Sequence, residues 1–325
     1  MALPPQLEGR LRVPIIGAPM FLISNPQLVI AQCTAGIVGS FPALNARPQS
    51  QLDEWLHEIT EALDTWDRDH PEQRAAPFAV NQIVHASNPR WEDDVETCGR
   101  WQVPIVISSL GARDDLNHMV HGWGGITLHD VINDRFARKA IQKGADGLIA
   151  VAAGAGGHAG QQSPFALVQE IRSWFDGPLV LSGAIATGRS VLAAQAIGAD
   201  LAYIGSPFIA TTEANAPAGY KQAIVDGAAG DIVYSDFFSG IHGNYLRPSI
   251  AAAGLDPDAL PGKELRSLHL DDGQTETKAW KDIWGSGQGI GAVRSIEPTA
   301  DRVDRLAREY QSARREMTER LATPV

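Results

Sequence analysis

The sequence is short of cysteine and holds no recognisable metal-binding pattern. Its 325 residues include only two cysteines, Cys33 and Cys98, which lie far apart in segments with helical character. We expect both to be small buried side chains rather than a disulfide or a nucleophile. Cysteines and histidines do not pair at the spacing of a zinc site, so we expect no metal.

Basic residues and long apolar runs are also scarce. There are 27 Lys and Arg against 38 Asp and Glu, which gives a formal net charge of −11. This balance argues against nucleic acid or an anionic membrane surface as a partner. The apolar run VPIIGAPMFLI is too short to span a bilayer, and the first residues, MALPPQLEGRLRVP, do not have the pattern of a signal peptide. We therefore expect a soluble, cytoplasmic protein that acts on a small molecule.

What the sequence does have is a repeated alternation of apolar runs and helical patterns. Near-continuous apolar runs are typical of parallel strands that are buried on both faces. Gly36, Gly144 and Gly198 stand where helices end before the next strand. The eight runs, over about 215 residues, predict an α/β fold of the (β/α)₈ TIM-barrel type, with a doubly wound open sheet as the alternative. The expected strands cover 13–20, 36–43, 77–84, 103–111, 124–131, 145–154, 177–185 and 199–207.

The alternation stops after Phe208, which suggests three parts. We expect residues 1–212 to form the barrel and 213–292 a small helical cap over its mouth. The charged amphipathic pattern in 293–325 predicts a C-terminal helix that returns to the outside of the barrel.

The carboxyl ends of the strands of such a barrel meet at one face, where active sites lie. The loops after the last two strands read SGAIATGRS and IGSPF. Their small residues expose backbone N–H groups, which favours a bound phosphate. The stretch GAGGHAG, from Gly154 to Gly160, follows the sixth strand and has two interpretations. It matches the dinucleotide pattern G-x-G-x-x-A, or it is an open clearing in which His158 faces a bound ring. No acidic residue follows the next strand to hold a ribose, which favours the clearing.

Four stretches resemble the FMN-dependent nitronate monooxygenases, formerly called 2-nitropropane dioxygenases. They are GAPM at 17–20, GAGGHAG at 154–160, SGAIATG at 182–188 and IGSPFIATTE at 204–213. The segment KAWKDIWGSGQGIG, with Trp280, Trp284 and Gln288, is similar to the C-terminal part of that family. The same superfamily includes NADH:quinone reductases and FMN-containing enoyl-ACP reductases.

The resemblance implies a bound FMN and assigns roles to particular residues. His158 corresponds to the active-site histidine of the family, which faces the reactive side of the flavin. An imidazole suits proton transfer near neutral pH. The residues that the resemblance places around FMN are Ala18, Pro19, Met20, Asn81, His129, Gly156, Gly157, Ser182, Gly183, Gly205 and Ser206. The expected substrate contacts in the cap are His242, Asn244 and Tyr245, and Arg247 is a further candidate; all four could instead only order their own loop.

Two departures from the family pattern leave the reaction open. Relatives often carry Glu or Gln where this chain has Gly154, and many have Lys where it has Asp130. The first hypothesis is the oxidation of alkyl nitronates with O2 to carbonyl compounds and nitrite. The second is NAD(P)H-dependent reduction of quinones or enoyl thioesters, and the third is a non-catalytic flavin-binding barrel. A homodimer is a possible assembly.

Overall fold

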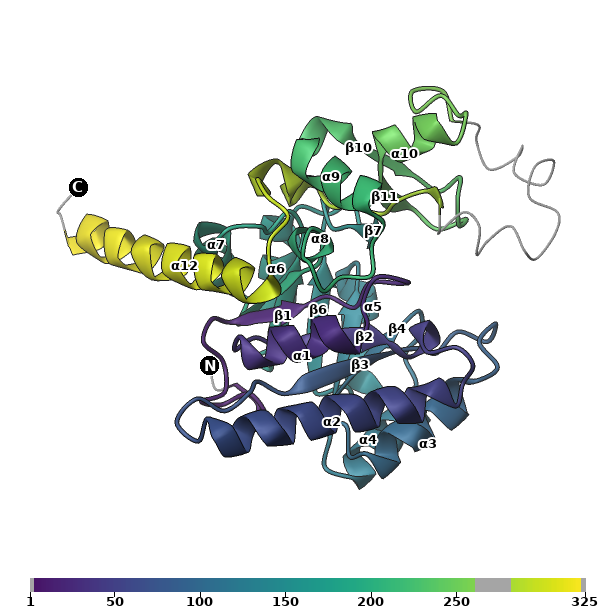
Figure 1. Cartoon of the computed structure of the whole chain (residues 1–325), viewed down its shortest axis with the longest axis vertical. Helices are drawn as coiled ribbons and strands as arrows, with labels where there is room; N and C mark the ends of the chain where they lie inside the picture. Colours follow the sequence, from purple (N-terminus) through teal and green to yellow (C-terminus); the bar gives the residue numbers. More distant parts are fainter. Residues whose placement is uncertain (1–2, 261–281, 323–325) are drawn as a thin grey trace.

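The computed structural model describes residues 3–260 and 282–322, and its centre is a ring of eight parallel strands (Figure 1). The neighbours run in the order β1-β9-β8-β6-β5-β4-β3-β2. A parallel bridge between Ile16 and Val38 joins the two end strands. The strands are β1 Ile15–Gly17, β2 Gly39–Pro42, β3 Phe78–Ile83, β4 Ile105–Ser109, β5 Ile126–Val131, β6 Gly147–Val151, β8 Leu179–Ser182 and β9 Leu201–Ile204. All eight predicted strands and the (β/α)₈ barrel are confirmed, and the open-sheet alternative is excluded.

The barrel strands are buried because side chains pack on both of their faces. Ile16, Ile107 and Ile149 belong to a cluster contributed by many of the strands, and each is 0% exposed. Side chains at alternate positions, such as Ile15 and Leu148, belong to a second cluster that includes the surrounding helices. This two-sided burial explains why the strands are near-continuous apolar runs.

Helices connect successive strands and start and stop at the residues that the sequence indicates. The side chains of Asn25 and Asn133 cap the first turns of α1 and α5. Gly36, Gly144 and Gly198 all have positive φ just beyond helix ends, as predicted. The helices are α1 Pro26–Thr34, α2 Gln51–Asp69, α3 Trp91–Arg100, α4 Asp114–Gly122, α5 Asp134–Gln142, α6 Pro164–Arg172, α7 Gly188–Ala196 and α8 Ser206–Ile209, with a 3₁₀ turn η1 at Ala43–Asn45. No helix in the described part of the chain is long and apolar enough to cross a membrane.

The cap contains strands as well as helices, so the prediction of a helical cap was incomplete. Its elements are α9 Ala218–Asp226, η2 Ala229–Asp231, β10 Ile232–Ser235, β11 Gly243–Leu246, α10 Arg247–Ala252 and η4 Gln288–Ala292. β10 and β11 form an antiparallel sheet whose third strand is β7, Gly157–His158. The small sheet therefore joins the cap to the glycine-rich segment after β6, above one end of the barrel in Figure 1.

The last helix, α12 Thr299–Ala322, packs on the outside of the barrel beside α7 and α1 (Figure 1). Its contact with α7 is close: a Cβ at Gly188 would lie 2.1 Å from the backbone nitrogen of Tyr310. Arg302 of α12 is 1% exposed, and its guanidinium donates to the carbonyl oxygens of Ala210 and Ser295. These contacts attach α12 to the segment that follows the last barrel strand.

Candidate active site

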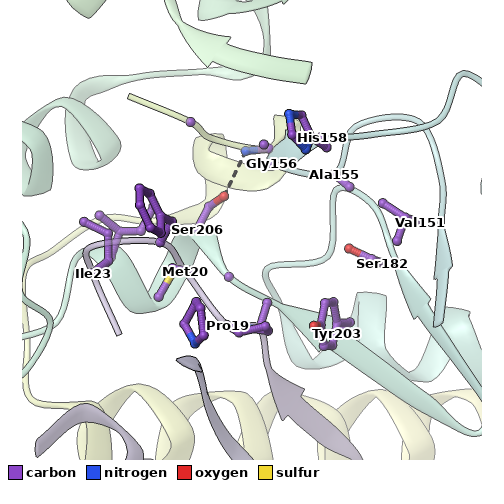
Figure 2. Close-up of a pocket in the computed structure, with 18 of the residues that line it drawn as sticks. Pro19, Met20, Ile23, Val151, Ala155, Gly156, His158, Ser182, Tyr203 and Ser206 are labelled. Carbon is purple, nitrogen blue, oxygen red and sulfur yellow. Dashed lines mark hydrogen bonds between the residues drawn. The ribbon is translucent and has the colours of Figure 1, made fainter. Parts of the chain in front are cut away.

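A cavity of about 920 Å³ opens at the carboxyl ends of the barrel strands. Every strand of the barrel contributes to its wall, as expected for the catalytic face of this fold. Ala18, Pro42, Asn81, Ser109, Asp130, Val151, Ser182 and Gly205 are examples, one from the end of each strand. Figure 2 shows Pro19, Ser182, Tyr203 and Ser206 around the cavity, with His158 on the cap side.

The structure brings together all but one of the residues predicted to surround the cofactor. Those that line the cavity are Ala18, Pro19, Met20, Asn81, Gly156, Gly157, Ser182, Gly183, Gly205 and Ser206, together with His158. They come from the ends of five different barrel strands, β1, β3, β6, β8 and β9, which sequence spacing alone could relate only through the barrel fold.

His129 is the exception, because it is not among the lining residues. Its Nδ1 faces the carbonyl oxygen of Asp130 at 2.8 Å, and its Nε2 faces that of Gly111 at 2.5 Å. The ring is 5% exposed and its two nitrogens are engaged with the main chain. This geometry favours a structural role at the end of β5.

The expected substrate contacts in the cap also lie outside the cavity wall. Asn244 and Tyr245 are 2% and 0% exposed, and the Asn244 amide donates to the Ala155 carbonyl at 2.6 Å. His242 is exposed and stacks on Tyr234 with ring centroids 5.0 Å apart. Arg247 pairs with Asp258 at 2.7 Å. The contacts of His242 and Arg247 are within the cap, and that of Asn244 attaches the cap to the segment after β6.

GAGGHAG does not have the geometry of a dinucleotide turn, and its residues 154–158 line the cavity. Its residues Gly157 and His158 pair with β11, and the next helix starts only at Pro164, so the turn does not open a helix as a dinucleotide site requires. A Cβ at Gly156 would lie 2.8 Å from the Gly287 backbone nitrogen. At Gly157 it would meet nothing within 4 Å, but this residue has a φ of +66°. The glycines are thus needed mainly for close backbone packing against the segment around 286–287 and for positive φ.

His158 itself is half-buried at the cavity wall. Its Nε2 lies 2.9 Å from the hydroxyl oxygen of Ser239. Burial lowers the pKa of His158 below its ordinary value of 6.5, because the charged imidazolium loses solvation. This shift favours the neutral form of the ring, which can accept a proton.

A carboxyl group, that of Asp130, also lies in the cavity wall, at the end of β5. The Ser109 hydroxyl donates to Asp130 at 2.6 Å and accepts from the Asn81 amide at 2.6 Å. Burial raises the pKa of Asp130, while the neighbouring His129 acts in the opposite direction. Since Asn81 also donates to the Ile107 carbonyl, its own Oδ1 is the group that it can offer a ligand.

The ends of β8 and β9 form a cradle of small residues. Ser182, Gly183, Gly205 and Ser206 all line the cavity there, and the Ser206 hydroxyl accepts from the Gly287 N–H at 2.9 Å. A Cβ at Gly183 would lie 2.8 Å from the Ala153 carbonyl oxygen, and its φ is +142°, so glycine is required. No Lys or Arg occurs among the described lining residues. Backbone N–H groups and hydroxyls are thus what this end presents to an anion.

An aromatic pair from the C-terminal part forms another portion of the wall. Tyr220 and Trp284 stack with centroids 4.8 Å apart, and the Tyr220 hydroxyl donates to the Gly285 carbonyl. Both side chains line the cavity. Trp284 therefore packs against Tyr220 and also forms part of the cavity wall. Gln288 lies beside Gly154, where a Cβ would approach its Oε1 to 3.0 Å. Trp280 lies outside the described residues.

Comparisons with known proteins agree with this geometry. The family model for nitronate monooxygenase matches residues 7–309. The chain belongs to the nitronate monooxygenase family.

Individual relatives are distant but match over nearly the whole chain. A nitronate monooxygenase from Paraburkholderia phytofirmans is 26% identical, covering 92% of this chain and 93% of its own length. A nitroalkane oxidase from Streptomyces ansochromogenes superposes with a TM-score of 0.79 at 22% identity, over 95% of this chain and 98% of its own. FabK from Thermotoga maritima gives 0.78 at 23%, over 97% of each chain. At these identities the two structures establish the fold only.

Members of the nitronate monooxygenase family are flavin-dependent oxidoreductases, and the cavity of this chain fits a flavin. Its volume is at the upper end of the usual range for ligand sites. The wall combines apolar residues with a few polar groups.

Sequence analysis missed residues that approach the site from distant parts of the chain. Ser239 is 81 residues from His158, and nothing in its local sequence marks it. Tyr220 lies in the segment after Phe208, where the only signal in the sequence is that the alternation of strands and helices stops. Asp130 was noticed only as a departure from the family pattern.

Proposed function

We propose that this member of the nitronate monooxygenase family binds FMN and oxidises alkyl nitronates with O2 to carbonyl compounds and nitrite. The observation that carries the proposal is the position of His158 in the wall of a cavity reached by all eight strands, where burial lowers the pKa of its imidazole and favours the neutral form. A neutral imidazole can remove the acidic α-proton of a nitroalkane, and in its protonated form it attracts the nitronate anion.

The residues at the ends of β1, β3, β8 and β9 are suited to hold the cofactor. Ser182, Gly183, Gly205 and Ser206 would bind the phosphate, and Pro19 with Met20 would support the ring system. Asn81 would offer its Oδ1 to the polar part of the ligand. When bound, FMN supplies the electron transfer that no amino-acid side chain provides.

The test of this proposal is a comparison of His158→Asn with the unaltered protein. Under anaerobic conditions, flavin reduction is followed with nitroethane, ethylnitronate, NADH and NADPH. We expect His158→Asn to retain FMN and to lose about 10²- to 10⁴-fold in rate with nitroethane. The loss with preformed ethylnitronate should be smaller, because that substrate has already given up its proton.

His242→Asn is the matched control, since His242 lies outside the cavity wall. It should leave every rate unchanged. Equal rates for His158→Asn and the unaltered protein with nitroethane would contradict the proposal.

A second candidate is an NAD(P)H-dependent reductase of quinones or enoyl thioesters. It is favoured by the size of the cavity, about 920 Å³, and by the stacked Tyr220 and Trp284 in its wall, which suit a bulky or planar substrate. Faster flavin reduction by NADH or NADPH than by ethylnitronate would select this candidate.

A further inference from the structure

We propose that Ser239 is a positioning residue that holds the neutral ring of His158 in the Nε2–H tautomer, so that Nδ1 exchanges the proton with the substrate. The inference rests on the proposed function of His158 as a base. It adds which ring nitrogen reacts and which residue of the cap decides it.

Ser239 and His158 are in direct contact. The Ser239 oxygen lies 2.9 Å from Nε2 of His158, within the range of a good hydrogen bond. His158 is on β7, directly after the barrel strand β6, whereas Ser239 belongs to the connection between β10 and β11. The cap therefore supplies a hydrogen-bonding partner to a histidine that the barrel places.

The second step is that the turn around Ser239 is anchored. Phe237 and Phe238 precede it and are 5% and 6% exposed. The ring of Phe238 packs edge-to-face on Tyr245 at 4.9 Å, and the Gly240 N–H closes the turn onto the Asp236 carbonyl at 2.8 Å. A serine held in this way is preorganised to contact the imidazole.

The third step counts protons at the Ser239 hydroxyl. A hydroxyl has one proton to donate, and a carbonyl oxygen can only accept. Ser239 lies 2.9 Å from the Ile241 carbonyl, which takes that proton. Towards His158 the Ser239 oxygen is then an acceptor, so Nε2 must donate.

The tautomer follows from this count. A neutral imidazole has one N–H, and if it is on Nε2 the lone pair is on Nδ1. When a nitroalkane is deprotonated, its α C–H bond breaks and the electron pair remains on the carbon–nitro group as the nitronate. The proton is added to Nδ1, and the resulting imidazolium keeps its Nε2–H bond to Ser239.

The tautomer can be read directly by ¹⁵N NMR of the purified holoprotein labelled in histidine, with His158→Gln used to identify the His158 signals. At a pH where the ring is neutral, we expect a pyrrole-type shift for Nε2 and a pyridine-type shift for Nδ1. A protein whose His158 carries its proton on Nδ1 would overturn the proposal, even if no variant folds.

Variants then test whether Ser239 is the cause. Ser239→Ala should give a mixture of tautomers and about a tenfold lower rate with nitroethane, the equivalent of one hydrogen bond. Ser239→Thr keeps the hydroxyl and should restore both. Tyr245→Phe is the control, because the Tyr245 hydroxyl is 3.5 Å from Ser239 and is not required by the proton count. An unchanged tautomer in Ser239→Ala would contradict the proposal.

The two proposals fail separately. If ethylnitronate and nitroethane do not reduce the flavin while the tautomer is as expected, the nitronate reaction is wrong and the role of Ser239 stands. If the substrates react and the tautomer is Nδ1–H, the positioning role is wrong and the reaction stands.

Discussion

At the scale of the residue, the burial of His158 has a consequence for pH dependence. Burial lowers its pKa below the ordinary 6.5, so the neutral, proton-accepting form persists to lower pH than in an exposed histidine. We expect kcat/KM with nitroethane to fall on the acidic side with an apparent pKa below 6.5. A pH–rate profile measures this, and the acidic limb should be absent from the residual activity of His158→Asn.

The lowered pKa of His158 also makes the folded state less stable at acidic pH. The unfolded chain binds a proton at His158 near pH 6.5, and the folded chain does so only at lower pH. Below 6.5 the unfolded state therefore binds more protons, and the free energy of unfolding should decrease as the pH falls. In His158→Asn this part of the decrease should be missing when urea unfolding is compared at pH 7 and pH 5.

Both Gly183 and Gly205 lie in the small-residue loops that predict the phosphate site. A substitution at Gly205 tests that site with less disturbance of the backbone than one at Gly183. Gly183 has a φ of +142°, so any substitution there strains the backbone. Gly205 has a φ of −111°, and the nearest side chains to a Cβ there would be those of Ala18 and Met20, at 3.4 and 3.6 Å.

We expect Gly205→Asp to fold and to bind FMN up to about a thousandfold more weakly, since two unit charges 4 Å apart repel by about 4 kcal/mol at an effective dielectric constant of 20. Gly205→Asn has nearly the same shape without the charge and should bind much more tightly than Gly205→Asp. Titration of the apoprotein with FMN measures both. Equal affinities for the two variants would place the phosphate elsewhere.

At the scale of the element, strands and helices were predictable where one local signal determined them. The apolar runs gave all eight barrel strands, and Gly36, Gly144 and Gly198 marked helix ends. β7 could not be found in this way, because it is two residues long and exists through its pairing with the distant strand β11, in which Gly243 and Asn244 face His158 and Gly157. The need for glycine at Gly156 likewise comes from the distant segment around Gly287.

The crossing of α7 and α12 depends on one glycine. A Cβ at Gly188 would lie 2.1 Å from the Tyr310 nitrogen and 2.3 Å from the Leu306 carbonyl oxygen, so the two helices would have to separate. We expect Gly188→Ala to lower the free energy of unfolding by about 1–3 kcal/mol or more, as overpacking does.

Gly122→Ala is the matched control, at the last residue of α4 with nothing within 4 Å of its Cβ. It should be neutral or stabilise by up to about 1 kcal/mol. Urea unfolding measures both changes. If Gly188→Ala were as stable as the unaltered protein, α12 would not pack as closely against α7 as the structure shows.

At the scale of the whole molecule, the proposed cofactor contacts barrel and C-terminal segments together. The cavity wall includes strand ends of the barrel and also Tyr220 and Trp284. Binding to the folded state alone adds about 2.7 kcal/mol at a ligand concentration of 100 times Kd. We expect FMN to raise Tm by about 5 °C under such conditions.

Riboflavin, which lacks the phosphate, is the control for this prediction and should raise Tm much less at the same concentration. Differential scanning fluorimetry or calorimetry measures both shifts. Equal shifts for FMN and riboflavin would contradict a phosphate site at Ser182, Gly183, Gly205 and Ser206.

The site could be predicted to the extent that the barrel determines it. Because strand ends meet at one face, residues as far apart as Pro19 and Gly205 could be assigned to one rim from the sequence. Cap residues such as His242 and Asn244 could not be placed, since no repeating architecture relates them to the rim. Their hydrogen bonds to the segment after β6, from the Asn244 amide to the Ala155 carbonyl and from the Ala159 N–H to the His242 carbonyl, became visible only with the fold.

The strand formed by Gly157 and His158 sets a limit on how relatives of this protein can be recombined. A chimera that exchanged only residues 213–292 would bring a foreign edge against β7 and a foreign residue to the place of Ser239. It would also change the backbone that faces Gly156. A crossover that preserves these contacts must therefore transfer residues 154–160 together with 213–292, so that the exchanged unit includes a piece of the barrel chain.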